Sequence, residues 1–307
     1  MAARAVGGLA RARVARFSLL RYRPGDRHGV LWASTRNIGD EIQTLAVIDM
    51  LRRCGVDRYG LIDRERLRAY SGPPLTLVMN GWFTHSPAQF PPRGHVKPVY
   101  IGFHCTPSMV GAVVVRNAKH FRAHQPIGCR DDFTREALER VGVEAYLSGC
   151  PSLTFEPHER KDGGVYCINT HHEAPPSPFE GTLLERVGLE RLGLERGDVE
   201  HISHRLDPRL INRPERRLEL ARELLERYRA AKLIVTSRLH VALPSRAFHT
   251  DVAFINARYD DEPRFMVLHD VLNGSAEGPL SPEQVKTDRV AVARHRDGLM
   301  EALRRAL

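Results

Sequence analysis

The sequence contains few cysteines, and they follow no pattern. Five are scattered among 307 residues, and no two form a C-x-x-C pair. An odd and irregular set of cysteines excludes a disulfide framework and a cysteine-based zinc site, and it is typical of a reducing compartment. We therefore expect a cytoplasmic protein of ordinary globular composition, with 42% hydrophobic and 27% charged residues.

Long apolar runs are also missing. The longest, such as residues 110–115, have the length of a strand in a protein core. A membrane-spanning helix needs about 18 or more apolar residues in a row. The sequence therefore predicts no transmembrane segment.

The surplus of basic charge is concentrated at the N-terminus. The formal net charge is +9, and residues 1–25 hold six arginines and no acidic residue. The rest of the chain holds 40 basic and 37 acidic residues, so it is almost neutral and general nucleic-acid binding loses its support. We expect residues 1–27 to form a separate arginine-rich extension, either loosely ordered or in peripheral contact with a membrane surface.

Several catalytic signatures are absent. The sequence has no G-x-x-x-x-G-K-[ST] phosphate loop, no G-x-G-x-x-G dinucleotide motif after a strand and no G-x-S-x-G nucleophile motif. Histidine pairs such as His201 and His204 lack an obvious third ligand, and the acidic pairs are adjacent rather than spaced. The sequence therefore predicts neither a metal site nor a bound cofactor.

Short apolar runs alternate with amphipathic segments along the whole chain. Eight runs are expected to form strands: 30–33, 59–62, 75–79, 99–101, 165–168, 199–202, 233–236 and 252–255. Helices are expected at 41–53, 132–141, 214–229 and 290–307. This alternation predicts an α/β fold with parallel sheets covered by helices. We expect two Rossmann-like domains, at residues 28–157 and 158–307, whose sheets face a cleft.

Polar side chains recur directly after the expected strands. They are Arg36, Asn37, Asp40, Asn80, Trp82, His85, His104, Arg130, Asp131, His171, His172, His204, Arg238 and His240. Ligands bind outside the carboxyl ends of parallel strands. Arginine and histidine at these ends suit a small anion with several charges, because they supply fixed donors and proton transfer near neutral pH. Each residue taken alone is equally well explained as a helix cap or a hydrogen-bonded surface residue.

Five short motifs follow one another in a fixed order. They are Asn37-Ile38-Gly39-Asp40, Asn80-Gly81-Trp82-Phe83, Gly128-Cys129-Arg130-Asp131, Ser148-Gly149-Cys150 and Ser237-Arg238-Leu239-His240. Each motif is short, but the ordered set resembles the polysaccharide pyruvyl transferase family over about residues 28 to 270.

The resemblance implies a two-domain fold similar to glycosyltransferases of the GT-B type, with the active site between the domains. It implies phosphoenolpyruvate as donor and a sugar with two suitably placed hydroxyls as acceptor. The two would be joined as a cyclic pyruvate ketal with release of phosphate. In the family, the arginine that matches Arg130 and the sequence that matches Arg238, Leu239 and His240 are associated with the donor.

The chemistry of this donor suggests roles for individual residues. Phosphoenolpyruvate carries a carboxylate and a phosphate, so Arg130 and Arg238, expected in opposite domains, would clamp its two ends. Histidine can move the protons that ketal formation requires, and His240 is the first candidate for general acid or base, with His104 second. Asp40 is expected to act as a base or to orient a partner, unless it only caps the helix that follows it.

Four further residues complete the expected substrate-binding set: Asn37, Asn80, Trp82 and His85. Cys150 is expected to be a buried and inert thiol, because the sequence places no histidine beside it.

Three alternative functions remain open. The same donor site could serve a small hydroxylated or amino metabolite in place of a glycan, since membership of a family constrains the donor pocket more than the acceptor pocket. A nucleotide-sugar-dependent glycosyltransferase shares the fold class, although no diphosphate-metal signature is present. A carbohydrate-binding module without catalytic activity is the third.

Overall fold

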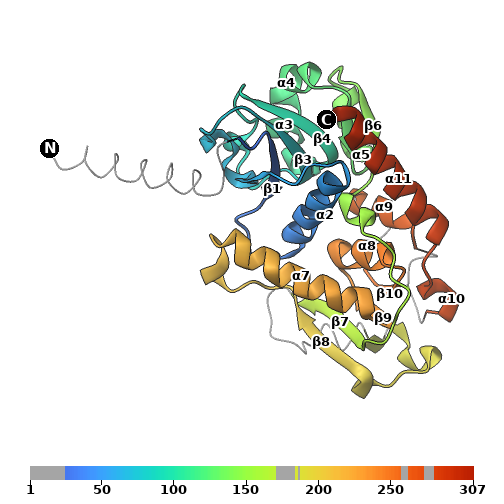
Figure 1. The fold of residues 1–307 in the computed structure, drawn as a ribbon. Helices are drawn as coiled ribbons and strands as arrows, with labels where there is room; N and C mark the ends of the chain where they lie inside the picture. The colour runs from blue at the N-terminus through green and yellow to red at the C-terminus, as the bar shows by residue number, and fades with distance from the viewer. Residues whose placement is uncertain (1–24, 171–183, 186, 257–261, 273–279) are drawn as a thin grey trace.

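Two parallel β-sheets with helices packed against them organise the chain (Figure 1). The computed structural model describes residues 25–170, 184–185, 187–256, 262–272 and 280–307. The predicted α/β class with two parallel sheets is confirmed. The first sheet and the helices that follow its strands form the first lobe, and the second sheet with its own helices forms the second lobe.

Among the described residues, the first sheet has six strands in the order β2-β1-β3-β4-β5-β6, all of them parallel. Their bounds are β1 His28–Trp32, β2 Gly60–Asp63, β3 Leu75–Trp82, β4 Val96–His104, β5 Ile127–Cys129 and β6 Ala145–Leu147. The chain runs from β1 to β2 on one side and then to β3 on the other, so the strand order reverses between β1 and β3.

The second sheet, counted over the same described ranges, has four parallel strands in the order β10-β9-β7-β8. Their bounds are β7 Val165–Thr170, β8 Val199–Ser203, β9 Leu233–Thr236 and β10 Asp251–Phe254. Strand β9 is buried along its whole length, as expected for an apolar strand inside a covered sheet. Here the order reverses between β7 and β9.

The main helices connect these strands. Their bounds are α2 Gly39–Arg53, α3 Val110–Val113, α4 Ala118–Ala123, α5 Asp132–Glu139, α7 Pro214–Ala230, α8 Leu239–Ala247, α9 Met266–His269, α10 Pro282–Val285 and α11 Arg289–Ala306. Within the described part of the chain, no helix is both long and apolar enough to cross a membrane.

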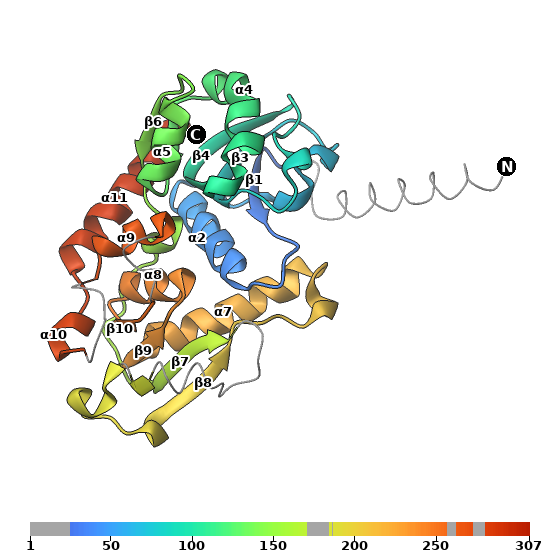
Figure 2. The ribbon, with the colours of Figure 1, turned by 180° about the vertical axis from the view of Figure 1, so that it is seen from behind.

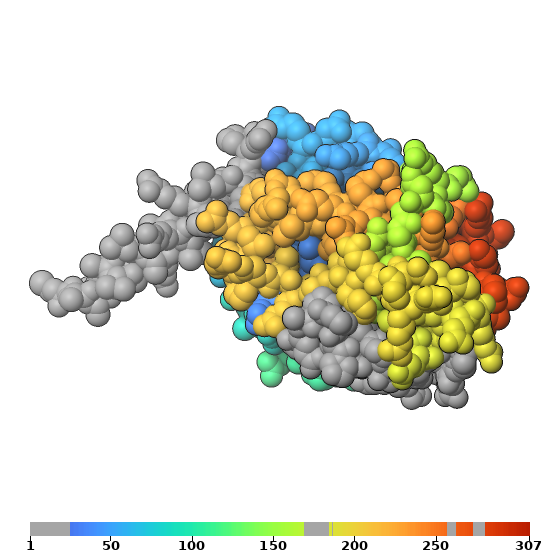
Figure 3. Space-filling model, turned by 90° about the horizontal axis from the view of Figure 1, so that it is seen from below, coloured from blue at the N-terminus to red at the C-terminus, as the bar shows by residue number. Residues whose placement is uncertain are grey.

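Helix α2 lies between the two lobes (Figure 2). Eleven of its 15 residues are buried, because it is covered on nearly all sides. One hydrophobic core runs from Val30 of β1 through Ile42 of α2 to Leu218 of α7 and Val241 of α8. Blue atoms of the first lobe are visible between yellow and orange atoms of the second when the molecule is seen from below (Figure 3). The lobes are therefore joined by a continuous core.

A buried ion pair crosses the same interface. Arg217 of α7 lies 2.8 Å from Glu41 of α2, and both side chains are fully buried. Arg217 also donates from NH1 to the carbonyl oxygen of Thr35 at 2.5 Å. Burial raises the pKa of Glu41 to about 8, although the charge and the hydrogen bond of Arg217 oppose the rise, so the state of each buried group depends on the other.

The last helix, α11, runs back to the first lobe (Figure 1). It contacts β4 and the short 3-10 helix η5, Pro151–Thr154, as well as α8. Near its end the carbonyl oxygen of Ala306 accepts from Lys97 Nζ of β4 at 3.5 Å. Helix α11 thus contacts both lobes, and the division of the chain at residues 157 and 158 stays a prediction.

Three parts of the first lobe differ from expectation. Residues 110–115 form α3 and the start of a 3-10 turn instead of the strand that their length suggested. Val113 and Val114 are fully buried while Val115 is 54% exposed, and an apolar run this short does not distinguish a strand from a turn of buried helix. Strands β5 and β6 were not predicted as strands, because each has only three residues and shows no readable period.

Candidate active site

The carboxyl ends of the two sheets meet where α2 and α8 begin. A Cβ added at Gly39, the first residue of α2, would lie 3.2 Å from the Cβ of His240 in the first turn of α8. Nearby, the Ile38 N–H donates to the carbonyl oxygen of His204, which follows β8, at 3.5 Å. The points at which the two strand orders reverse, where open parallel sheets bind ligands, therefore lie next to each other.

Four of the predicted residues come together here as the inter-lobe cluster: Asp40, His104, Arg130 and His240. They follow or end four different strands, β1, β4, β5 and β9. The charges of Arg130 and Asp40 both act on His240, and the charge of Arg130 also acts on His104. The strand-end argument thus selected side chains that lie near one another in space.

A carboxylate orients His104. Its Nδ1 lies 2.5 Å from Oδ2 of Asp131, and Oδ1 of Asp131 accepts from the backbone N–H and the hydroxyl of Thr134, each at 2.9 Å. Because an ionised carboxylate only accepts, Nδ1 of His104 carries the proton and Nε2 holds the lone pair. Nε2 is buried and has no hydrogen-bond partner among the described residues. His104 is therefore held in one orientation, and its Nε2 lone pair is available to accept a proton.

Arg130 is a buried cation without a carboxylate of its own. Its side chain is 2% exposed, and Nε and NH1 lack hydrogen-bond partners within the described part of the chain. The neighbouring Asp131 uses its oxygens on His104 and Thr134. Burial accordingly lowers the pKa of Arg130. A guanidinium in this condition is stabilised by an anion that binds beside it.

Asp40 forms an ion pair with Arg64, a residue that was not among the predicted site residues. Oδ1 of Asp40 lies 3.0 Å from NH1 of Arg64, and Oδ2 accepts from the Thr35 hydroxyl at 2.8 Å. Burial alone would raise the pKa of Asp40, but the charge of Arg64 and these hydrogen bonds outweigh it and lower the pKa. Asp40 is thus an ionised carboxylate that these contacts fix in place, and it orients Arg64. The alternative of helix capping is wrong, since the N–H of Gly39 is bonded by Oδ1 of Asn37 at 3.1 Å.

His240 contacts Cys150 of the other lobe. Its Nε2 lies 3.8 Å from the Cys150 Sγ. Cys150 is buried, as predicted, and beside it lies a histidine that the sequence alone could not place there. The two residues are 90 positions apart, and only the packing of α8 against η5 brings them together.

Both histidines of the inter-lobe cluster are neutral at pH 7. Burial, together with the charge of Arg130, lowers the pKa of His240 to about 3 and the pKa of His104 to about 4. An anion bound beside Arg130 would offset its charge and raise both pKa values. Ligand binding and proton uptake are therefore coupled at this site.

The end of β3 lies beside the Asp40–Arg64 pair. The guanidinium carbon of Arg64 is 5.8 Å from the ring centre of Trp82, and the exposed His85 meets the Trp82 ring edge-on at 4.3 Å. Oδ1 of Asn80 and Nε1 of Trp82 are buried without a hydrogen-bond partner among the residues described. The three predicted residues of this strand end thus contribute further polar atoms near the cluster.

Arg238 and Leu239, the other two residues of the Arg-Leu-His sequence, have different surroundings from those of His240. Leu239 is buried in the core shared by the lobes, so its side chain packs against the other apolar residues of that core. The charge of Arg238 acts on the hydroxyl of Tyr228 in α7. The expected clamp of one donor between Arg130 and Arg238 stays a prediction.

A second arginine of the second lobe was missed. Arg264 belongs to the 3-10 turn Pro263–Phe265 that precedes α9, and its charge acts on Arg130, His104 and His240. No motif or strand end in the sequence points to it. Arg64 was also missed, although it directly follows β2 and the strand-end argument, applied to that strand, would have found it.

The other histidines singled out in the sequence are not part of this cluster as far as the structure describes them. His204 is buried, and its Nε2 lies 2.5 Å from the Tyr228 hydroxyl. His171 and His172 lie outside the described residues. Among the residues that are described, no group of three or more His, Cys, Asp or Glu side chains could hold a metal ion.

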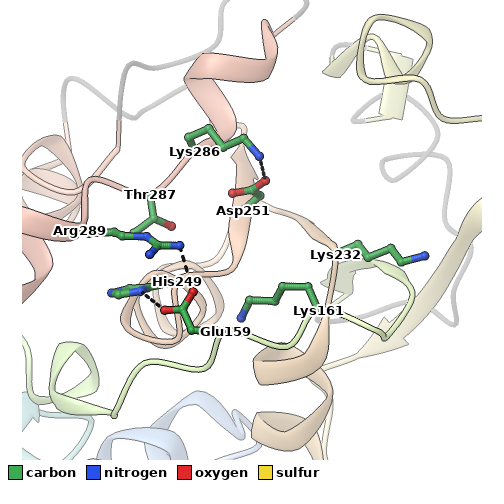
Figure 4. Close-up of a pocket in the computed structure, with 8 residues that line it drawn as sticks. All are labelled: Glu159, Lys161, Lys232, His249, Asp251, Lys286, Thr287 and Arg289. Carbon is green, nitrogen blue, oxygen red and sulfur yellow. Dashed lines mark hydrogen bonds and ion pairs between the residues drawn. The ribbon is translucent and has the colours of Figure 1, made fainter.

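A separate hollow of about 350 Å³ lies at the amino ends of β9 and β10, at the opposite edge of the second sheet (Figure 4). Its lining residues are Glu159, Lys161, Lys232, His249, Asp251, Lys286, Thr287 and Arg289. Lys286 Nζ lies 2.6 Å from Asp251, and Glu159 lies 3.3 Å from both His249 and Arg289. Both carboxylates of this hollow are thus occupied by neighbouring cations, in contrast to the unpaired guanidinium of Arg130.

Comparison with solved structures gives only remote likenesses. An uncharacterised protein from Klebsiella pneumoniae is 13% identical, with a TM-score of 0.42 over 83% of this chain and 91% of that one. The UDP-GlcNAc 2-epimerase of Methanocaldococcus jannaschii is 11% identical, with a TM-score of 0.39 over 90% of this chain and 91% of that one. The glycosyltransferase SnogD from Streptomyces nogalater is 15% identical, with a TM-score of 0.37 over 90% of this chain and 95% of that one.

Sequence comparison gives a more definite result. No curated protein matches the chain. The model of one family, described as polysaccharide pyruvyl transferase, matches residues 37–257, which is well over half of the chain and includes all four residues of the inter-lobe cluster. The chain therefore belongs to the polysaccharide pyruvyl transferase family.

Proposed function

We propose that this protein transfers the pyruvyl group of phosphoenolpyruvate to two hydroxyls of a sugar, forming a cyclic ketal and releasing phosphate. Membership of the family supports the class of transfer. The observation that carries the choice of donor is Arg130, whose buried Nε and NH1 lack partners among the described residues. A small molecule with a carboxylate and a phosphate supplies the oxygens that this guanidinium needs.

The proposed reaction builds two bonds to the central carbon of the donor. A proton adds to the methylene carbon, which becomes a methyl group, and one sugar oxygen bonds to the central carbon. The second sugar oxygen then bonds to the same central carbon, and the bond between that carbon and the phosphate oxygen breaks. Of the two hydroxyl protons released, one is balanced by the new methyl hydrogen and the other leaves with phosphate.

In this proposal the two histidines of the inter-lobe cluster share the proton transfers. His104, with its free Nε2 lone pair, accepts a proton from an acceptor hydroxyl. His240 exchanges a proton at the donor. Its pKa is low while Arg130 is unpaired, and it rises when the anionic donor binds.

The donor anion is bound by arginines in the same proposal. Arg130 from the first lobe and Arg238 from the second contact its two ends, and Arg264 adds positive charge from the second lobe. Trp82 and His85, at the end of β3, form the side on which the sugar lies, since aromatic rings offer an apolar face to a sugar ring.

The experiment that tests the proposal measures phosphate release from phosphoenolpyruvate with and without a panel of free, lipid-linked and nucleotide-linked sugars. Release should depend on an added sugar and should be lost in Arg130→Ala. Arg140→Ala, which removes an exposed guanidinium from the end of α5, is the matched control and should be as active as the wild type. Transfer from a nucleotide sugar with no use of phosphoenolpyruvate would overturn the proposal and indicate a glycosyltransferase.

Two further variants separate binding from turnover. Arg238→Ala should abolish donor binding and leave the fold intact, and unchanged affinity for phosphoenolpyruvate would remove Arg238 from the site. His240→Gln should lower kcat far more than donor affinity. An equal loss of both would give His240 a binding role instead.

A further inference from the structure

We infer that Cys150 is a positioning residue, whose thiol holds the imidazole of His240 in one tautomer and one orientation. The inference rests on the proposed function, in which His240 moves a proton at the donor. It gives a role to the motif Ser148-Gly149-Cys150, which the proposed reaction does not otherwise use.

The backbone that carries the thiol is closely packed. A Cβ at Gly102 of β4, where φ is +71°, would lie 2.6 Å from Cδ of Pro151 and 3.1 Å from the carbonyl oxygen of Gly149. At Gly149, where φ is +79°, a Cβ would lie 3.0 Å from Nδ1 of His295 in α11. The Gly102 N–H also donates to the Ser148 hydroxyl at 2.9 Å. These contacts with β4 and α11 fix the place of the next residue, Cys150.

The thiol itself lies between two polar groups. Its Sγ is 3.1 Å from Oγ of Ser152 and 3.8 Å from Nε2 of His240. Cys150 and Ser152 are both fully buried, so we expect the S–H and O–H groups to donate hydrogen bonds to acceptors within the protein. One arrangement of donors and acceptors gives both hydrogens an acceptor. In it the Ser152 hydroxyl donates to Sγ, and the thiol S–H donates to Nε2 of His240.

This arrangement decides which nitrogen of His240 carries the proton. Since the ring is neutral at pH 7 and Nε2 accepts from the thiol, the proton lies on Nδ1. Nδ1 is then the nitrogen that the substrate meets, and it presents a donor. The charge of Arg130 also acts on His240, but no hydrogen bond joins the two side chains among the described residues, so Arg130 does not select the tautomer. Asp131 serves His104 in the corresponding way.

The first test reads the tautomer directly in the protein without substrate. Nitrogen-15 NMR of labelled histidine, with the His240 signals identified by their loss in His240→Gln, should show the Nδ1–H tautomer in the wild type. Cys150→Ser should keep it, because a hydroxyl also donates, and Cys150→Ala should give a mixture. Cys150→Val, which fills the space without a donor, replaces Cys150→Ala if that variant does not fold. An unchanged tautomer in the alanine or valine variant would overturn the inference.

The second test measures turnover. Cys150→Ala should lower kcat about tenfold, the lower end of what loss of an orienting partner costs in comparable sites. KM for phosphoenolpyruvate should stay within about twofold. Cys150→Ser should recover most of kcat, which also excludes a covalent role for the thiol. Cys167→Ala removes another fully buried thiol, from β7, and should leave kcat unchanged.

Two outcomes of the kinetic test have different meanings. If Cys150→Ser is as slow as Cys150→Ala, the volume or the sulfur itself matters, and the positioning role is overturned. If the wild type does not use phosphoenolpyruvate, the proposed function fails, whereas the NMR measurement still decides whether Cys150 sets the tautomer of His240.

Discussion

At the scale of single residues, two buried arginines of the first lobe differ in how their charge is compensated. Arg64 bonds Asp40 at 3.0 Å and Glu65 at 2.9 Å. Burial alone would lower the pKa of Arg64, but these carboxylates outweigh it and raise the pKa. Burial lowers the pKa of Arg130, which forms no such pair with any residue that the structure describes. An uncompensated buried charge costs stability, and it is retained where a ligand supplies the opposite charge.

This contrast predicts a large effect on stability at one residue and a small effect at the other for the same substitution. Arg64→Met should lower the free energy of unfolding by about 3–5 kcal/mol, because it leaves Asp40 and Glu65 buried without their cation. Arg130→Met removes an unpaired charge and should change stability by no more than about 1 kcal/mol, while abolishing donor binding. Urea denaturation of both variants is the check. A loss for Arg130→Met as large as that for Arg64→Met would show that Arg130 is structural.

The low pKa of His240 predicts how stability depends on pH. The unfolded chain binds a proton at this residue below about pH 6.5, but the folded protein does so only below about pH 3. Stability therefore falls as pH is lowered from about 6.5 and is fully present above it. In His240→Gln, unfolding free energies measured between about pH 5 and pH 6 should show a slope smaller by up to about 1.4 kcal/mol per pH unit. His104 keeps its own contribution in that variant. An identical slope would mean that His240 titrates normally.

The sequence allowed part of the site to be predicted at this scale. Asp40, His104, Arg130 and His240 were found because strand ends converge in any parallel sheet. Their partners depend on contacts between residues far apart in sequence, and periodicity carries no information about these. The contact of His240 with a cysteine 90 positions away is the clearest case.

At the scale of elements, the segment after β6 is held by glycines with positive φ. Gly102→Ala should lower the free energy of unfolding by about 2–4 kcal/mol, from left-handed strain and the clash with Pro151. The same change at Gly298, inside α11 with no atom within 4 Å of an added Cβ, should raise it by about 0.5–1 kcal/mol. Thermal and urea denaturation of the two variants test this. A tolerated alanine at residue 102 would mean that η5 can move.

Most elements were predicted within one or two residues where their pattern is long or strongly apolar. Helix α7 spans Pro214–Ala230 against an expected 214–229, and β9 spans Leu233–Thr236 as expected. Two long strands are exceptions, since β3 spans Leu75–Trp82 against an expected 75–79 and β4 spans Val96–His104 against an expected 99–101. The remaining failures are short. Residues 110–115 are apolar but helical, and β6 has three residues, so neither contains enough positions for a period to be read.

At the scale of the whole molecule, the ion pair between Glu41 and Arg217 links the lobes. Arg217→Met should lower the free energy of unfolding by about 3–5 kcal/mol, because the Glu41 carboxyl, whose pKa burial already raises to about 8, then stays buried without its partner and must be protonated. The double variant Glu41→Met with Arg217→Met should recover at least half of that loss. The double-mutant cycle in urea is the measurement. A double variant as unstable as the single one would show that the carbonyl contacts of Arg217 matter more than the pair.

Two parallel sheets could be predicted from alternating strands and helices, but the way the lobes are joined could not. The burial of α2 between them and the return of α11 to β4 are long-range packing, visible in the sequence only as the apolar run 45–48 within a helix and as an amphipathic chain end. The buried Glu41 would have been taken for a surface residue, since its partner is 176 positions away.

The central claim is that the inter-lobe cluster joins the pyruvyl carbon to two sugar oxygens. The most direct measurement follows phosphoenolpyruvate labelled with carbon-13 at its central carbon, in the presence of an acceptor sugar that supports phosphate release. The label should appear as a ketal carbon bonded to the sugar, with one ketal formed for each phosphate released. Phosphate release with the label in free pyruvate, or no use of the donor with any sugar, would contradict the account.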